Sequence, residues 1–162
     1  MPTPDPESVL KELGLELPPP AKPVAAYIPA RRVGQVLYVS GQIPILPACA
    51  GQPAQLLHTG IVPSQVTLEQ AQACARQCVL NALAILKSEA GGLHRLRQVV
   101  RLGCFVACES DFTDQPRVAN AASELLVKVF GPAGQHARAA VGAPSLPLNA
   151  PVEIEFMFEL AE

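Results

Sequence analysis

The chain has 162 residues, of which 49% are hydrophobic and only 16% are charged, and its formal net charge is −2. This length suits one domain that buries about 70% of its unfolded surface without help from disulfides or metals. The acidic balance supplies no basic patch of the kind that nucleic-acid binding requires, so the composition argues against nucleic acid as a partner. Because typical chains are about 25% charged, we expect an apolar part of the surface to be covered in an oligomer.

The sequence shows neither the pattern of a membrane span nor that of a secretory signal. No stretch reaches the roughly 18 uninterrupted apolar residues of a membrane span. The opening "MPTPDPESVLKELG" lacks the basic and apolar regions of a secretory signal. The five cysteines are an odd number, which is typical of reduced intracellular thiols. We therefore expect a cytoplasmic protein that does not associate with membranes.

The first 24 residues are predicted to form an N-terminal arm. Asp5 is suited to cap a short helix that Pro6 opens, and "LPPPAKP" at 17–23 is typical of a polyproline linker. Residues 25–162 are expected to form the domain itself.

The domain shows alternating strand and helix patterns. "TLEQ", beginning at Thr67, is a capping-box pattern, and apolar residues then recur at helical spacing until "GG" at 91–92. In chain order we first predict a strand at 35–44, a mostly irregular segment at 45–66 with a short strand near 56–58, and a helix at 67–90. A strand at 98–108 follows, which is apolar on both faces and is therefore expected to be central in the sheet or to lie between layers. The chain then continues with a helix from about 114 to Gly131 and ends with strands at 137–142 and 152–160. This order predicts an α+β fold in which a mixed or antiparallel sheet carries both helices on one face.

Three charged residues stand out on the last two predicted strands: Arg138, Glu153 and Glu155. If these strands pair with each other, Arg138 faces Glu153 or Glu155 across the ladder. A cross-strand ion pair worth about 0.2–1 kcal/mol is one interpretation. A guanidinium that binds the carboxylate of a ligand through two hydrogen bonds is the other.

The cysteines suggest, but do not support, a metal site. Cys74 and Cys78 lie on or beside the apolar stripe of the first helix. Cys104 and Cys108 lie on a strand, where four residues span about 13 Å, which is too far for both sulfurs to bind one ion. We predict buried free thiols and no metal.

Nucleophilic catalysis finds little support in the sequence. The histidines at 58, 94 and 136 lie near no serine or cysteine in a recognisable arrangement, and "YVSGQ" lacks the G-x-S-x-G pattern. No glycine-rich phosphate loop is apparent, since "GPAG" at 131–134 ends a helix.

Several motifs together suggest a family. Tyr27 is followed by "LYVSGQIP" at 37–44, "NALAIL" occupies 81–86, and "DF…VAN" spans 111–120. The chain ends in "ARAAV…LP…VEIEF", with fifteen residues from Arg138 to Glu153. These motifs resemble, in order and nearly in spacing, those of the reactive intermediate deaminase family (Rid or YjgF, also labelled L-PSP endoribonuclease). The resemblance covers about residues 25–162.

The resemblance implies a chorismate-mutase-like α+β fold that assembles as a homotrimer with clefts between subunits. It implies the hydrolysis of imines and enamines of 2-amino acids to 2-oxo acids and ammonia, without a metal or organic cofactor. Arg138 matches the residue that binds the substrate carboxylate, and Glu153 matches the residue that positions or activates water. Four further positions match residues that line the cleft: Tyr27, Ser40, Gly41 and Asn120.

Some positions depart from the family pattern. The usual "PARS" is "HARA" here, so Ala139 follows the arginine, and Ser123 stands where an aromatic residue is common. These departures resemble a longer branch with "GxHAR". Because Arg138 and Glu153 are retained, the deaminase interpretation leads. The alternatives are an endoribonuclease, as in the family label, and a non-catalytic module that binds small carboxylates.

Overall fold

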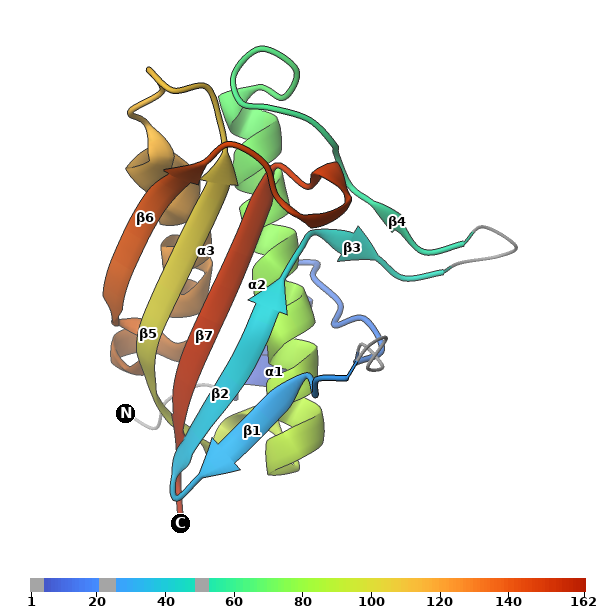
Figure 1. Cartoon of the computed structure of the whole chain (residues 1–162). Coiled ribbons are helices and arrows are strands. Elements are labelled where there is room, and N and C mark those ends of the chain that lie inside the picture. The colour runs from blue at the N-terminus through green and yellow to red at the C-terminus, as the bar shows by residue number, and fades with distance from the viewer. Residues whose placement is uncertain (1–4, 21–25, 49–52) are drawn as a thin grey trace.

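The computed structural model of the protein describes residues 5–20, 26–48 and 53–162, and shows a five-stranded mixed sheet with its long helices on one face (Figure 1). The strand order is β1-β2-β7-β5-β6, in which β6 runs parallel to β5 and the other neighbours are antiparallel. The strands are β1 (Ala30–Val33), β2 (Val36–Gln42), β5 (Leu96–Ala107), β6 (Ala137–Ala143) and β7 (Val152–Leu160). The α+β prediction with both helices on one face is confirmed.

Both long helices begin and end where the sequence indicated. Helix α2 (Leu68–Ala90) is preceded by Thr67, whose hydroxyl accepts from the Gln70 amide while the Gln70 side chain accepts from the Thr67 amide. Gly91 ends this helix in the left-handed conformation. Helix α3 (Gln115–Phe130) carries a proline in its first turn and stops before Gly131. Among the described residues, no helix combines the length and apolar character that crossing a membrane would take.

The shorter strands differ from the predictions in position. Strand β1 is an additional edge strand that the sequence did not predict. The predicted short strand near 56–58 lies slightly earlier, as β4 (Gln55–Leu56), and it pairs with β3 (Ile45–Leu46) in a separate two-stranded hairpin. Two-residue strands carry too few apolar positions for a period to be read from the sequence.

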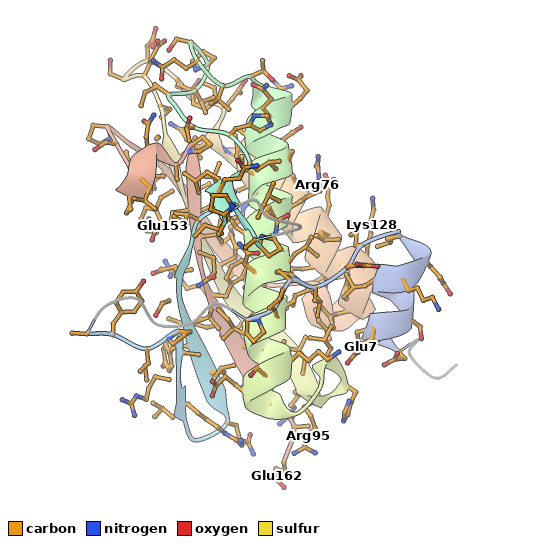
Figure 2. All side chains as sticks on the ribbon, turned by 90° about the vertical axis from the view of Figure 1, so that its right-hand side faces the viewer. Glu7, Arg76, Arg95, Lys128, Glu153 and Glu162 are labelled. Atoms are coloured by element: carbon orange, nitrogen blue, oxygen red, sulfur yellow. The ribbon has the colours of Figure 1, made fainter. Side chains whose placement is uncertain are left out.

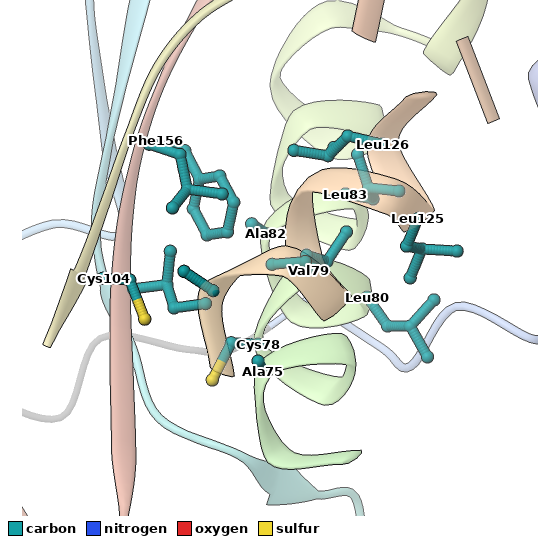
Figure 3. Packing of buried hydrophobic residues seen from close by; sticks show 14 of the residues in the cluster. Ala75, Cys78, Val79, Leu80, Ala82, Leu83, Cys104, Leu125, Leu126 and Phe156 are labelled. Atoms are coloured by element: carbon teal, nitrogen blue, oxygen red, sulfur yellow. The ribbon is translucent and has the colours of Figure 1, made fainter. Parts of the chain in front are cut away.

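The core lies between the sheet and the two long helices. On β7, five apolar residues alternate with polar ones, and each is at most 2% exposed: Val152, Ile154, Phe156, Phe158 and Leu160. Figure 3 shows Phe156 and Cys104 of the sheet facing Cys78, Val79 and Leu83 of α2 and Leu126 of α3. This packing fixes which face of each strand is buried, and therefore which side chains point away from the helices.

The order of the strands corrects one expectation. Strands β6 and β7 do not pair with each other, because β5 lies between them and pairs with both. The β5–α3–β6 connection is a parallel crossover, which places β6 at the sheet edge. As predicted, β5 is an inner strand, paired on both sides, whereas β7 occupies the centre of the sheet.

The N-terminal arm contacts the helical layer. Helix α1 (Pro6–Glu12) is capped by Asp5, which accepts from Ser8 N, and its Leu10 is buried in the core. Lys87 of α2 forms an ion pair with Glu7. The chain that follows α1 runs beside α2 toward the β3–β4 side of the molecule (Figure 1). Part of the predicted linker, residues 21–23, lies outside the described residues.

Candidate functional site

Arg138 is held at the sheet edge by helix α3. Its Nη1 donates to Asn120 Oδ1 at 2.9 Å and to Ser123 Oγ at 3.0 Å. Its other N–H groups donate to no acceptor among the described residues, and the side chain is exposed. A guanidinium fixed through one nitrogen keeps its remaining donors for a planar, bidentate acceptor such as a carboxylate.

Ser123 and His136 form a contact that the sequence analysis did not predict. Ser123 Oγ lies 3.1 Å from His136 Nε2, and His136 Nδ1 lies 2.6 Å from Gly134 O. A carbonyl oxygen accepts only, so Nδ1 donates to Gly134 O, and Nε2 is left for the hydrogen bond with the serine hydroxyl. The sequence did not predict this contact, in which the serine hydroxyl also accepts from Arg138.

Gly134 explains how the two residues meet. The turn at Gly131–Gly134 folds the chain back along α3, and a Cβ at Gly134 would overlap the Leu126 carbonyl. Only glycine allows this close approach of two backbones. The "GPAG" sequence was therefore a usable signal that the following residues return to α3, although it did not identify Ser123 as the contact.

Glu153 lies on the other face of the sheet, against Gly41 of β2. A Cβ at Gly41 would overlap Glu153 Oε1, so the glycine leaves the space that the carboxylate occupies. Burial, and secondly the nearby Glu155 carboxylate, raise the pKa of the Glu153 carboxyl. A carboxylate with a raised pKa is a better proton acceptor than an ordinary surface glutamate. Figure 2 labels Glu153 at the end of the sheet where the β3–β4 hairpin lies.

Two further predicted residues lie near Gly41. Ser40 donates its hydroxyl to Ile28 O at 2.8 Å, and its amide donates to Pro29 O at 2.9 Å. These bonds hold the segment that carries Tyr27 alongside β2. Tyr27 is 54% exposed, and together with Ser40 it lines a cavity of about 410 Å³ on the open face of the sheet.

Glu155 has a structural partner other than the one expected. Its Oε1 lies 2.7 Å from Arg101 Nη1 of the neighbouring strand β5. Arg138 makes no ion pair with Glu153 or Glu155 within the chain, since all described ion pairs of Glu155 involve Arg101. The cross-strand ion pair interpretation of Arg138 was wrong, because β5 separates the two strands.

The six predicted site residues therefore fall into two groups within one chain. Arg138 and Asn120 lie at the β6 edge on the helix side of the sheet. The second group lies around the end of β2 on or near the open face: Tyr27, Ser40, Gly41 and Glu153. Within one chain, the two groups lie on opposite faces of the sheet.

The cysteines of α2 and β5, and Cys108 directly after β5, are buried free thiols, as predicted for Cys74, Cys78, Cys104 and Cys108. Burial raises the pKa of the Cys104 thiol to about 12, so it stays protonated at neutral pH. Cys49 lies outside the described residues. Among the residues that the structure describes, no group of three metal-binding side chains occurs together.

The sheet order and the helices on one face define a chorismate-mutase-like α+β protein. Residues 7–160 match the family model described as "YjgF/chorismate_mutase-like, putative endoribonuclease". The chain belongs to this YjgF family, the family that its motifs indicated.

Individual relatives agree with this assignment. Protein TCP17 of Trypanosoma cruzi is 38% identical over 154 residues, which is 93% of this chain and 91% of the relative. The crystal structure of a "putative endoribonuclease" from Shewanella oneidensis has a TM-score of 0.89 at 35% identity, covering 96% of this chain and 99% of that one. The structure of the YjgF gene product of E. coli has a TM-score of 0.60 at 26% identity, covering 87% and 92% of the two chains.

Proposed function

We propose that the protein hydrolyses 2-imino acids and their enamine tautomers to 2-oxo acids and ammonia. The observation that supports this function most directly is the state of Arg138, whose Nη1 is bound by Asn120 and Ser123 while its other donors point to no described acceptor. Such a group binds the carboxylate that every 2-imino acid carries. The half-buried Glu153 supplies the proton acceptor that hydration of an imine requires.

The proposed reaction needs only water and proton transfers. Glu153 accepts a proton from water as the water oxygen bonds to C2 of the N-protonated imine and the C=N π electrons move to nitrogen, which gives a neutral carbinolamine. Glu153 returns this proton to the carbinolamine nitrogen, the C–N bond breaks with its electrons leaving on ammonia, and the hydroxyl proton passes to Glu153 or solvent to give the 2-oxo acid. Arg138 holds the carboxylate throughout, which fixes C2 relative to the water. No metal or organic cofactor takes part in this proposal.

The active form in this proposal is a homotrimer, in which the β6 edge of one copy meets the Glu153 region of the next. The open sheet face and its edges carry exposed apolar side chains, among them Tyr38, Val33 and Val141. Exposed apolar surface of this kind is typical of an interface between copies. Such an arrangement brings together the two groups of site residues that one chain keeps apart. The described cysteines are free thiols, which is typical of proteins in a reducing compartment. We therefore place this enzyme in the cytoplasm.

A coupled assay tests the activity. A threonine dehydratase releases 2-iminobutanoate, and 2-oxobutanoate is followed at a pH where spontaneous hydrolysis is slow. We expect the protein to accelerate product formation, and Arg138→Ala to lower kcat/KM by about 100-fold or more. Arg117→Ala is the matched control, because Arg117 is exposed on α3 and pairs only with Asp114 among the described residues. No acceleration above background, or an equal loss in both variants, would contradict the proposal.

Ribonuclease activity, which the descriptions of relatives include, has less support. The net charge of −2 offers no cationic track for a nucleic-acid strand. RNA cleavage that persists through purification and disappears in Glu153→Gln would favour it instead. Binding of 2-oxo acids without turnover of any imine would favour the non-catalytic alternative.

A further inference from the structure

A second cavity lies beside Gly41, at the end of strand β2. Its volume is about 530 Å³, and it is enclosed by the end of β2, the β3–β4 hairpin, the turn at Pro147–Asn149 and the proline segment of the arm. Cavities of roughly 300–1,000 Å³ are the usual size for small-molecule sites. This cavity shares Gly41 with the Glu153 contact and Tyr27 with the open-face cavity.

The cavity is apolar in its chemistry. Its walls include Ile43, Ile45, Pro47 and Leu148, together with two prolines of the arm. Two buried amides also line it, but their N–H groups are already used. Gln42 Nε2 donates to Ser40 O at 2.8 Å, and Asn81 Nδ2 donates to Ile43 O and Ile45 O, both at 3.1 Å.

The Asn81 carbonyl is also occupied, since it accepts from Gln77 Nε2 at 2.9 Å. The amide of Asn81 therefore fixes the chain at 43–45 rather than facing a ligand. With so few free polar groups, the cavity favours an apolar ligand group, because a polar one would lose its hydrogen bonds to water.

The arm is fixed firmly enough to form a wall. Leu10 is buried, Glu7 pairs with Lys87, and Leu15 and Leu17 pack against the core just before the prolines. Pro18 and Pro19 then reach the cavity. Proline has a fixed φ and no N–H, so this wall is stiff and donates no hydrogen bond.

Leu148 marks the mouth of the cavity. It is 74% exposed and adopts a φ of 54°, a left-handed conformation that is costly for leucine. Strained conformations of this kind concentrate at ligand sites. An exposed apolar side chain held in this conformation is suited to close over an apolar ligand.

We infer that this cavity binds the side chain of the substrate, and that the substrate is therefore an imino acid with a large branched or aromatic apolar side chain. The inference rests on the proposed function, since the cavity is lined by Gly41, which lies against the Glu153 carboxylate. The proline segment of the arm and the β3–β4 hairpin become determinants of specificity. A small substrate such as 2-iminopropanoate leaves most of the cavity unfilled.

The test compares two imines made in situ by an amino-acid oxidase with catalase, one from leucine and one from alanine. We expect kcat/KM for the leucine imine to exceed that for the alanine imine by about tenfold or more. Ala54 lines the cavity and is exposed, so Ala54→Trp fills the space without disturbing the core. It is expected to abolish the preference by slowing only the leucine imine. Ser88→Trp, on the exposed face of α2, is the matched control.

A second variant shortens two side chains of the cavity wall instead of filling the cavity. Pro18→Ala with Pro19→Ala is expected to lower kcat/KM severalfold for the leucine imine and to leave the alanine imine unchanged. Equal kcat/KM for the two imines, or an equal effect of Ala54→Trp on both, would overturn the inference while leaving the proposed function in place.

If neither imine is hydrolysed, the proposed function fails. A binding measurement then tests the side-chain pocket on its own. Calorimetry would then compare pyruvate with 4-methyl-2-oxopentanoate. Tighter binding of the larger acid that Ala54→Trp removes supports the side-chain pocket on its own. No binding, or equal binding of both acids, overturns it.

Discussion

Arg138 and Glu153 lie on opposite faces of one sheet, with strand β5 between the strands that carry them. Arg138 is in register with Leu102, which is buried beneath the helices, and its guanidinium contacts α3. Glu153 is in register with Phe105 and contacts Gly41 on the far face. If both residues act on one substrate molecule, they belong to different copies of the chain.

Complementation between inactive variants follows from this separation. We expect Arg138→Ala and Glu153→Gln each to lose activity by about 100-fold or more. When the two variants are co-expressed, about one quarter of the intersubunit sites combine the intact Arg138 of one chain with the intact Glu153 of the other. The mixture should therefore recover a measurable share of the unaltered activity.

Controls for this experiment are direct. Co-expression of two differently tagged Arg138→Ala chains should restore nothing, because every site then lacks the arginine. Light scattering should show that mixed and unmixed samples have the same mass, three times that of the chain. A mixture no more active than its separate variants, or a monomer at micromolar concentration, would refute a site shared between subunits.

The large elements were predictable because their signals are local. The capping box at Thr67, the glycines after Ala90 and the strict alternation of β7 each act within a few residues, and all appear in the structure. The additional strand β1 was missed because Arg31 and Arg32 carry no apolar alternation. Its formation depends on pairing with β2, which is a tertiary contact.

The candidate site was less predictable, since it depends on long-range order. The sequence left open an ion pair of Arg138 with Glu153 or Glu155 across neighbouring strands. Strand β5 lies between β6 and β7, however, and Glu155 pairs with Arg101 of β5. Likewise, Ser123 and His136 meet only because the chain turns back at Gly134. Neither relationship has a periodic signature, because each is set by how elements pack rather than by local spacing.

Ser123→Ala tests whether the Ser123 hydroxyl, which contacts both His136 and Arg138, positions the guanidinium. Removing the hydroxyl deletes one of the two acceptors of Nη1, so the guanidinium becomes less well oriented. A hydrogen bond to a charged group contributes about 1.5–3 kcal/mol, so we expect KM to rise by about 10-fold or more with a smaller change in kcat. Steady-state kinetics with 2-iminobutanoate measures both constants.

Two further variants serve as controls for this experiment. Ser88→Ala removes an exposed hydroxyl far from Arg138 and should leave KM unchanged. Ser123→Thr keeps a hydroxyl and should restore most of the affinity. If Ser123→Ala lowers the melting temperature but leaves KM unchanged, the serine and histidine have a structural role only.

Glu153→Gln is expected to stabilise the protein at neutral pH. Burial and Glu155 raise the pKa of Glu153 in the folded chain, so the folded state holds this proton more tightly than the unfolded state. The stability from this group is fully present below the unfolded pKa of about 4.3 and is lost as the pH rises through the folded pKa. At pH 7 the ionised carboxylate therefore destabilises the fold, and the amide does not.

The expected effect is small, because the carboxylate is partly exposed and screened by solvent. We expect the melting temperature of Glu153→Gln to exceed that of the unaltered protein by about 1–2 °C at pH 7, and the difference to vanish near pH 4. Scanning calorimetry at both pH values measures it. Glu159 lies on the same strand as Glu153, and its carboxylate is 3.2 Å from Arg97 of β5. Glu159→Gln removes this ion pair and should not raise the melting temperature. A lower melting temperature for Glu153→Gln at pH 7 would contradict the raised pKa.

Gly41→Ala tests the contact between the glycine and the Glu153 carboxylate. The added methyl group would overlap Oε1, so the carboxylate must move away from the water that it is proposed to activate. Because misplacing a catalytic group by about 1 Å can cost 100-fold, we expect kcat to fall by about 10- to 100-fold while the circular dichroism spectrum is unchanged. Gly103→Ala is the matched control: its methyl group meets Glu155, which pairs with Arg101 and has no role in the proposed reaction.

A double variant separates a displaced carboxylate from a damaged fold. Aspartate is shorter by one methylene, so Glu153→Asp makes room for the methyl group at position 41. We expect Gly41→Ala to cost much less activity in the Glu153→Asp background than in the unaltered protein, because residues in contact are not additive. Equal losses in the two backgrounds would mean that the glycine serves the backbone of β2 and not the position of Glu153.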